Sequence, residues 1–389
     1  MRVTMDATKR LRIAISGSYG GMNLGDEAIL EGILSQLRAS VPADITVCSR
    51  NPADTLARHA VDRAISPRAL TRKEMAAELR DIDLLILGGG GILYDGDAEE
   101  YMREVFLAHE LSVPLFVYAI SAGPLTEQRS RQAVREALNA SPATVITVRD
   151  RLGYRLLEDV GVTQEIHLTA DPAFLLEPEA LPPEALRADG VEVGRRLVGF
   201  SVREPGPAAP DINPDEYYAL LANAADFIVK RYDADVVFVP MERTDVQHSH
   251  AVVAHMQKAE RAEILRRRYT PRQLIEVMGH FEFAVGMRLH FLIFAVLRGV
   301  PFAALPYASK VAGLLDDLEM EMPPLSSIGI GQLIARIDRS WDTRERIRET
   351  IETHRSNLKA RAARTHDLLL DFVRSRHDHS MTRENTGPA

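Results

Sequence analysis

The sequence predicts an α/β protein with two Rossmann-like domains, each built on a parallel β-sheet, that face each other across a cleft. Its 389 residues exceed the length of one typical domain. Short apolar segments alternate with helical patterns, which is typical of parallel sheets with crossover helices. The alternation is interrupted by a stretch rich in Pro, Glu and Gly at about residues 172–196, and then begins again.

The first domain is expected over residues 11–180, after an N-terminal tail at residues 1–10. Asp26 is expected to cap the first helix, because apolar residues at three- and four-residue spacing follow it. Thr71 and Glu74 have the spacing of a capping box and predict another helix start. Strands are expected where apolar and often β-branched or aromatic residues cluster, at residues 11–16, 44–49, 83–89, 113–120, 144–150 and 165–171.

The second domain is expected over residues 190–340. Thr270, followed by Pro at the first helical position and Gln273 in a capping box, predicts a helix start. Residues 341–376 are expected to form a C-terminal amphipathic helix, and residues 377–389 a disordered tail. The strands of this domain are expected at residues 197–202, 235–241, 263–265, 281–287 and 301–307.

Composition and charge argue against several classes of protein. The 55 acidic residues outnumber the 47 basic ones, whereas a nucleic-acid-binding protein needs a basic excess. The single cysteine, Cys48, is interpreted as a core residue of a reducing compartment. No apolar stretch reaches the roughly 18 residues of a membrane span, and no signal-peptide core is recognisable. We expect a cytoplasmic protein without a nucleic-acid partner, at the inner face of the membrane at most.

Residues 16–30 form a glycine-rich turn between a strand and a helix. Gly20 and Gly21 would let the backbone approach a ligand, and the helix that follows offers N–H groups to an anion. Asn23 adds hydrogen-bonding groups to the same turn. The spacing does not fit the G-x-G-x-x-G pattern, so a dinucleotide site is not predicted.

A second glycine-rich segment follows the strand expected at residues 83–89. It contains four consecutive glycines, including Gly89, Gly90 and Gly91, although a plain turn needs only one or two. Close contact between the backbone and a ligand is therefore the favoured interpretation. Asp95 lies just beyond, where it either accepts a hydrogen bond from a sugar hydroxyl or faces water.

Several basic residues are expected at the ends of strands. Arg149 and Arg203 each follow an apolar run, where an arginine either binds an anionic ligand or forms a salt bridge. Arg288 and His290 stand between the strand expected at 281–287 and a very apolar helix. Arginine is a rigid fork of donors for carboxylate or phosphate, and histidine exchanges a proton near neutral pH. A lone histidine here would be interpreted as a core residue, but its pairing with Arg288 favours an anion site, to which Tyr307 and Lys310 are expected to contribute.

Six motifs together resemble the polysaccharide pyruvyl transferase family. They occur in the expected order over about residues 11–320: GSYGGMNLGDEAIL, LILGGGGILYD, ITVRDRLGYRLLEDVGV, LTADPAFLL, GMRLHFLIFAVLRGVP and YASKVAGLL. The resemblance implies a fold like that of the glycosyltransferase B class, with the active site between a first domain on the acceptor side and a second domain on the donor side. It also implies phosphoenolpyruvate as donor, a saccharide acceptor that is free or lipid-linked, and a pyruvate ketal in an exopolysaccharide or cell-wall polysaccharide as product.

The same resemblance assigns Arg288, Leu289 and His290 to the donor, together with one upstream arginine, Arg149 or Arg203. His290 is the candidate general acid that protonates the donor's methylene carbon. Asp26, Asp95 or the deprotonated histidine would accept protons from the sugar hydroxyls. Neither a metal site nor a redox cofactor is expected. Two alternatives stay open: a nucleotide-sugar glycosyltransferase of the same architecture, and a non-catalytic protein that binds carbohydrate or phosphate.

Overall fold

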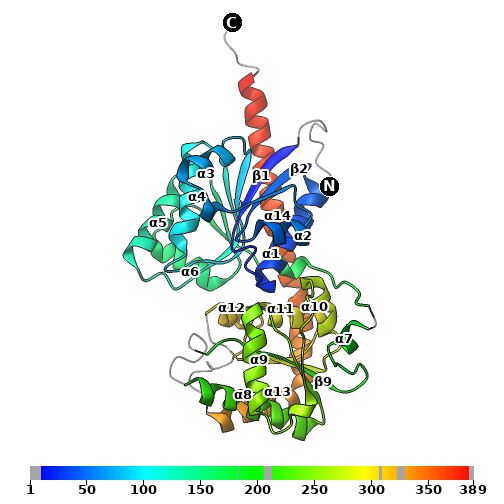
Figure 1. Ribbon diagram of the computed structural model, residues 1–389. Coiled ribbons are helices and arrows are strands. Elements are labelled where there is room, and N and C mark those ends of the chain that lie inside the picture. Colours follow the sequence, from blue (N-terminus) through cyan, green and yellow to red (C-terminus); the bar gives the residue numbers. More distant parts are fainter. Residues whose placement is uncertain (1–9, 183, 206–212, 306–308, 322–328, 385–389) are drawn as a thin grey trace. The chain divides into compact units, whose positions relative to one another are not determined.

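The computed structural model describes residues 10–182, 184–205, 213–305, 309–321 and 329–384. The chain divides into two compact units, each with a parallel sheet and helices around it, which confirms the predicted fold class (Figure 1). The first unit comprises Met1–Gly21, Ile29–Leu175 and Leu358–Ala389, and the second comprises Met22–Ala28 and Leu176–Asn357. Two stretches therefore belong to a different unit from their neighbours in the sequence. One of them, Met22–Ala28, carries part of the predicted glycine-rich turn.

The first unit is built on a parallel sheet of eight strands in the order β3-β2-β1-β4-β6-β7-β8, with β5 paired to β6. All six strands expected from the sequence are present, and β3 and β5 are additional. All eight residues of β6 are buried, as expected for a strand covered by helices on both faces. The strands are β1 (Leu11–Ser16), β2 (Ala43–Cys48), β3 (Arg63–Ile65), β4 (Leu84–Leu87), β5 (Gly90–Leu93), β6 (Leu115–Ala122), β7 (Val145–Val148) and β8 (Ile166–Leu168).

Two helix starts were predicted in this unit, and the structure has one of them as expected. Thr71 and Glu74 form the predicted capping box. The expected cap at Asp26 is wrong: helix α1 begins at Leu24, and the Asn23 side chain accepts a hydrogen bond from the Gly25 N–H at 2.9 Å. Asp26 lies in the first turn, where its charge suits the helix dipole. The helices are α1 (Leu24–Ser40), whose first residues up to Ala28 belong to the second unit, α2 (Pro52–Arg58), α3 (Arg72–Leu79), α4 (Ala98–Glu110), α5 (Gln128–Asn139) and α6 (Arg151–Val160).

The second unit has a parallel sheet of five strands in the order β11-β10-β9-β12-β13, and all five were expected from the sequence. The predicted helix start at Thr270 is also present, with its capping box. The strands are β9 (Leu197–Ser201), β10 (Asp235–Phe238), β11 (Ala262–Ile264), β12 (Phe283–Gly286) and β13 (Phe302–Ala304). The helices are α7 (Ala185–Ala188), α8 (Pro214–Tyr232), α9 (Arg243–His255), α10 (Pro271–Met278), α11 (Leu289–Arg298), α12 (Ser309–Asp317) and α13 (Ile330–Asp342).

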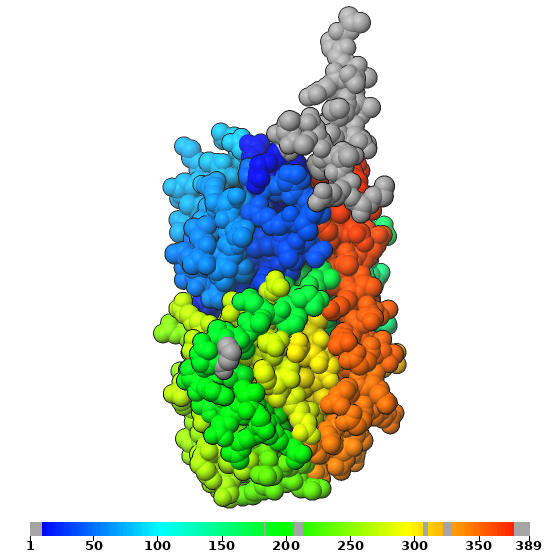
Figure 2. All heavy atoms as spheres, turned by 90° about the vertical axis from the view of Figure 1, so that its right-hand side faces the viewer, coloured from blue at the N-terminus to red at the C-terminus, as the bar shows by residue number. Residues whose placement is uncertain are grey.

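The last helix, α14, spans Arg344–Glu384 and continues beyond residue 376, where the sequence pattern ended it. It is amphipathic, since Ile351, Leu358 and Leu369 are buried while its charged residues reach the surface, orange to red in Figure 2. None of the helices in the described part of the chain is both long and apolar enough to cross a membrane.

Strand order identifies where ligands are expected to bind. In open parallel sheets ligands bind beyond the carboxyl ends of the strands, at the point where the direction of strand addition reverses. In the first sheet this switch lies between β1 and β4, and in the second it lies between β9 and β12. The residues that follow these four strands are therefore the first candidates for a site.

Candidate active site

The turn from β12 into α11 holds Arg288 and His290 at the carboxyl edge of the second sheet. Arg288 is the N-cap residue of α11 and His290 is the second residue of the helix. The body of the helix is apolar and buried, which anchors the turn. Gly286 permits close packing here, because a Cβ atom at this position would lie 2.4 Å from the Phe291 ring. Leu289, the third residue of the predicted donor motif, is buried.

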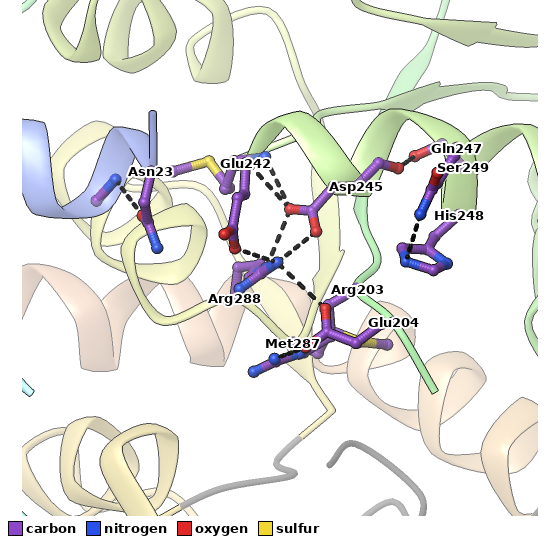
Figure 3. A network of polar contacts seen from close by, with 12 residues as sticks. Asn23, Arg203, Glu204, Glu242, Asp245, Gln247, His248, Ser249, Met287 and Arg288 are labelled. Carbon is purple, nitrogen blue, oxygen red and sulfur yellow. Dashed lines mark hydrogen bonds and ion pairs between the residues drawn. The ribbon is translucent and has the colours of Figure 1, made fainter. Parts of the chain in front are cut away.

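Arg288 is surrounded by carboxylates (Figure 3). Its Nε donates to Asp245 Oδ2 at 3.0 Å, and its Nη2 contacts Asp245 Oδ1. The same Nη2 lies 2.8 Å from Glu242 Oε2 and 3.6 Å from Glu204 Oε2. Burial raises the pKa of Asp245, although the Arg288 charge and its hydrogen bonds partly oppose this shift. The guanidinium is thus held in one orientation by a bidentate buried pair.

These three acidic residues were not predicted as part of the site. Glu242 and Asp245 follow β10 and sit at the start of α9, where Asp245 Oδ2 also accepts from the backbone N–H of Glu242 at 3.1 Å. Their Glu-x-x-Asp spacing after an apolar run is a helix-start signal that could have been recognised. Nothing in the sequence indicates that both point at Arg288, because β10 and β12 are separated by more than forty residues.

The structure brings one of the two candidate upstream arginines next to Arg288. Arg203 follows β9, and its Nη2 contacts Glu204 Oε1 while Arg288 approaches Glu204 Oε2, so Glu204 joins the two guanidinium groups. Arg149 lies in the other unit, where its Nη1 donates to Asp171 Oδ2 at 2.7 Å and both side chains are 4% exposed. Both arginines therefore form ion pairs, and Arg203 occupies the sheet edge that carries Arg288. Which of them binds the donor stays a prediction.

His290 packs against the glycine-rich turn. A Cβ atom at Gly25 would lie 2.0 Å from His290 Nδ1, so the imidazole occupies the space left by the glycine. The same turn is joined to the Arg288 cluster by an isolated β-bridge between Asn23 and Glu242 and by a 2.8 Å bond from the Leu24 N–H to the Met241 carbonyl. Met22–Ala28, which carries part of this turn, belongs to the second unit, although its place in the sequence predicts the first domain.

The remaining predicted donor residues are Lys310 and Tyr307. Lys310 is half-buried and is the second residue of α12, a helix that packs against α11. Tyr307 lies outside the described residues. In the part of the chain that the structure describes, no group of three or more His, Cys, Asp or Glu side chains is arranged to hold a metal ion.

Packing accounts for two of the five glycines proposed to approach a ligand, Gly20 and Gly89. Gly20 has a φ of +73°, and a Cβ atom there would lie 2.1 Å from Ser49 Oγ. A Cβ atom at Gly89 would lie 2.9 Å from Ile29. Gly90 and Gly91 do not lie in a loop, as the sequence analysis assumed, but begin β5 and pair with β6. Ligand contact at these positions, and at the exposed Gly21, stays a prediction.

Asp95 binds a neighbouring segment of the chain, which differs from both predictions, a contact with a sugar hydroxyl or exposure to water. Its carboxylate accepts hydrogen bonds from the Thr126 N–H at 2.8 Å, the Thr126 hydroxyl at 2.5 Å and the Glu127 N–H at 3.0 Å. These bonds, above all that from the Thr126 side chain, lower the pKa of Asp95. The side chain therefore ties down the segment before α5, and a role toward a sugar hydroxyl stays a prediction.

Comparison with known proteins identifies the family. The family model described as "Polysaccharide pyruvyl transferase" matches residues 23–309, which is more than half of the chain. The chain belongs to the polysaccharide pyruvyl transferase family. The match includes four candidate residues of this transferase that the sequence predicted: Arg149, Arg203, Arg288 and His290. It also includes the three carboxylates around Arg288, and Lys310 follows directly after it.

This pyruvyl transferase is similar along most of its length to the amylovoran biosynthesis protein AmsJ of Erwinia amylovora. The two are 21% identical over 396 residues, which cover 88% of this chain and 94% of the relative. The family and this relative together indicate a transferase of polysaccharide biosynthesis.

Solved structures with a similar fold include two proteins that are distant in sequence. One is a putative UDP-N-acetylglucosamine 2-epimerase from Listeria monocytogenes, with a TM-score of 0.65, 11% identity and coverage of 96% of this chain and 98% of that one. The other is Alr3699/HepE from Anabaena in complex with UDP and glucose, with a TM-score of 0.63, 12% identity and coverage of 94% and 100%. At this identity the likeness shows the fold alone, which is of the glycosyltransferase B type that the resemblance implied.

Proposed function

We propose that this pyruvyl transferase takes pyruvate from phosphoenolpyruvate and attaches it as a ketal to two hydroxyls of one sugar. The acceptor is a cell-surface polysaccharide or exopolysaccharide, or its precursor, and phosphate is released. The observation that carries the proposal is the meeting of Arg203 and Arg288 at Glu204, between the carboxyl ends of β9 and β12. Both arginines lie within the residues that match the family.

The chemical groups at this edge suit a small donor that carries two anionic groups. Phosphoenolpyruvate carries a carboxylate and a phosphate, and both need cations or aligned N–H donors when they leave water. Arg203 and Arg288 supply guanidinium groups, and Lys310 at the start of α12 adds an ammonium. The N-cap residue of α11 forms no side-chain capping bond, so the positive end of this helix suits an anion as well.

The carboxylates around Arg288 set a condition for binding. The cluster holds two guanidinium groups and three carboxylates, so an anionic donor has to displace a carboxylate or bind together with a proton. The side chains of Glu204 and Glu242 are each 33% exposed and can turn toward water, whereas Asp245 is fully buried. In this proposal the donor replaces Glu204 and Glu242 beside Arg288, while Asp245 keeps the guanidinium in place.

The proposed reaction proceeds by proton transfer and two additions to C2 of the donor. His290 protonates the methylene carbon, which becomes the methyl group, and C2 becomes electrophilic. One sugar hydroxyl attacks C2, the C2–O bond to phosphate breaks, and the second hydroxyl attacks C2 to close the ketal. The two hydroxyl protons pass to the neutral imidazole and to a carboxylate. Asp26 is our candidate for that carboxylate, because it lies in the same helical turn as Gly25, against which His290 packs.

Incubation with phosphoenolpyruvate and a panel of sugars tests this function. The panel contains glucosides, galactosides, N-acetylmannosaminides and lipid-linked oligosaccharides, and the readouts are phosphate release and the mass that a pyruvate ketal adds. Substitution His290→Ala is expected to abolish both readouts while the circular-dichroism spectrum is unchanged. A parallel thermal-shift series with UDP-glucose tests the glycosyltransferase alternative. Stabilisation by UDP-glucose alone, without any shift from phosphoenolpyruvate, would overturn the proposal.

A further inference from the structure

A second candidate site lies in the first unit, remote in sequence from the Arg288 cluster. A pocket of about 350 Å³ opens at the carboxyl ends of β1 and β2 and against helix α4. Its volume falls within the range of about 300–1,000 Å³ that is typical of small-molecule sites. None of the site residues expected from the sequence lines it. Most of the polar side chains in its wall come from α4 and from the segment after β2. They are Ser16, Ser49, Arg50, Arg68, Glu99, Glu100, Tyr101, Arg103 and Glu104.

Glu104 is the most unusual residue of this pocket. It projects from α4 and is only 5% exposed. Ser16 and Cys48 lie beside the carboxyl group, but its Oε2 accepts no hydrogen bond within the described residues. Burial raises the pKa of Glu104 to about 7. A buried carboxyl oxygen without a partner is costly and is uncommon unless a ligand or water completes its bonding.

Hydrogen-bond donors stand next to this acceptor. The Nη2 of Arg103 donates to the Pro67 carbonyl at 2.7 Å, whereas its buried Nε has no partner in the described part of the chain. Arg50 approaches the Tyr101 hydroxyl at 3.5 Å, and Arg68 is paired with Glu100. The wall therefore offers guanidinium donors, a phenol and a carboxyl acceptor side by side. A sugar ring fits such a mixture, because each hydroxyl is both a donor and an acceptor.

We propose that this pocket is a saccharide subsite, in which Glu104 accepts a hydrogen bond from one ring hydroxyl and Arg103 donates to another. That this saccharide is the acceptor sugar rests on the proposed function. Binding of a saccharide to the pocket, however, requires no phosphoenolpyruvate. The pocket lies beside the topological switch of the first sheet, which is where such sheets bind ligands.

Saturation-transfer NMR on the full chain tests the subsite without any turnover. The probes are the methyl glycosides of glucose, galactose and N-acetylmannosamine at millimolar concentration, with inorganic phosphate as a competitor. Substitution Glu104→Gln keeps the size of the side chain and is expected to weaken binding of at least one glycoside roughly tenfold. The matched control is Glu110→Gln on the same helix. Glu110 pairs with Arg72 at the surface, so this substitution is expected to leave glycoside binding unchanged.

Each outcome of this experiment either supports the saccharide subsite or contradicts it. Loss of glycoside binding in Glu104→Gln but not in Glu110→Gln supports the subsite. Equal binding by the wild type and Glu104→Gln, absence of binding of all three glycosides, or displacement of a bound glycoside by phosphate overturns it. If Glu104→Gln fails to fold, Tyr101→Phe takes its place under the same criteria. Thermal shift with phosphoenolpyruvate separates the two proposals, because a failed donor site leaves glycoside binding intact and a failed subsite leaves the donor shift intact.

Discussion

The imidazole of His290 lies directly against the backbone of Gly25, where a Cβ atom would come within 2.0 Å of Nδ1. Gly25 belongs to the first turn of α1 and His290 to the first turn of α11, so two helix starts fix one ring between them. Packing of this kind holds a side chain in one orientation, as a precise site requires. The glycine in the conspicuous GMNLGDEAIL motif thus has a steric reason that is separate from any ligand.

Substitution Gly25→Ala is expected to move the His290 ring and reduce phosphate release at least tenfold. The protein should still fold, because the clash is with a side chain that can rotate rather than with backbone. The matched control is Gly331→Ala in α13, since a Cβ atom there meets nothing within 4 Å. Steady-state kinetics with phosphoenolpyruvate measure the effect. Unchanged kcat in Gly25→Ala would contradict the proposed role of the ring.

Short runs of sequence predicted most strands, whereas contacts that form only in the folded chain were not predicted. The strands were predictable because a buried strand in a parallel sheet is a continuous apolar run, as in LLIL of β4. Strand β5 was missed because it begins with glycines, which have low strand propensity and were attributed to a loop. The carboxylates around Arg288 could not be predicted, since they come from the ends of β9 and β10 and meet Arg288 only through tertiary packing.

The two upstream arginines are expected to behave differently when each is replaced by glutamine. Arg203→Gln should raise the KM for phosphoenolpyruvate at least tenfold, because Arg203 shares Glu204 with Arg288. Arg149→Gln should instead destabilise the fold by about 3–5 kcal/mol, because it removes the cationic partner from a buried ion pair with Asp171. Kinetics and denaturant unfolding of both variants measure the two effects. A raised KM in Arg149→Gln at unchanged stability would reverse the assignment.

Removal of a carboxylate that competes with the donor is expected to strengthen donor binding. Glu204→Gln eliminates one negative charge near Arg288 and Arg203, so the affinity for phosphoenolpyruvate should rise several-fold at low ionic strength. Isothermal titration calorimetry at two salt concentrations measures the change. The control is Glu345→Gln, which removes a charge from an exposed ion pair with Arg348. Weaker binding in Glu204→Gln than in this control would mean that Glu204 orients the arginines instead of competing with the donor.

The buried Glu104 is expected to make stability depend on pH between about 4.5 and 7. Its pKa is raised from an ordinary value of 4.5 to about 7 in the folded chain. Within this window the folded state keeps a proton that the unfolded state has released, so the free energy of unfolding falls as the pH rises. The loss amounts to roughly 3 kcal/mol and levels off above pH 7.

His366 acts in the opposite direction, because burial lowers its pKa from 6.5 to about 4 and its contribution to stability grows as the pH rises through that interval. The contribution of Glu104 is therefore isolated as the difference between the wild type and Glu104→Gln. Denaturant unfolding at pH 5, 6, 7 and 8 is expected to show this difference shifting in favour of the variant up to pH 7 and staying constant beyond it. A difference that is independent of pH would mean that Glu104 titrates normally, and that the carboxyl is solvated in the folded protein.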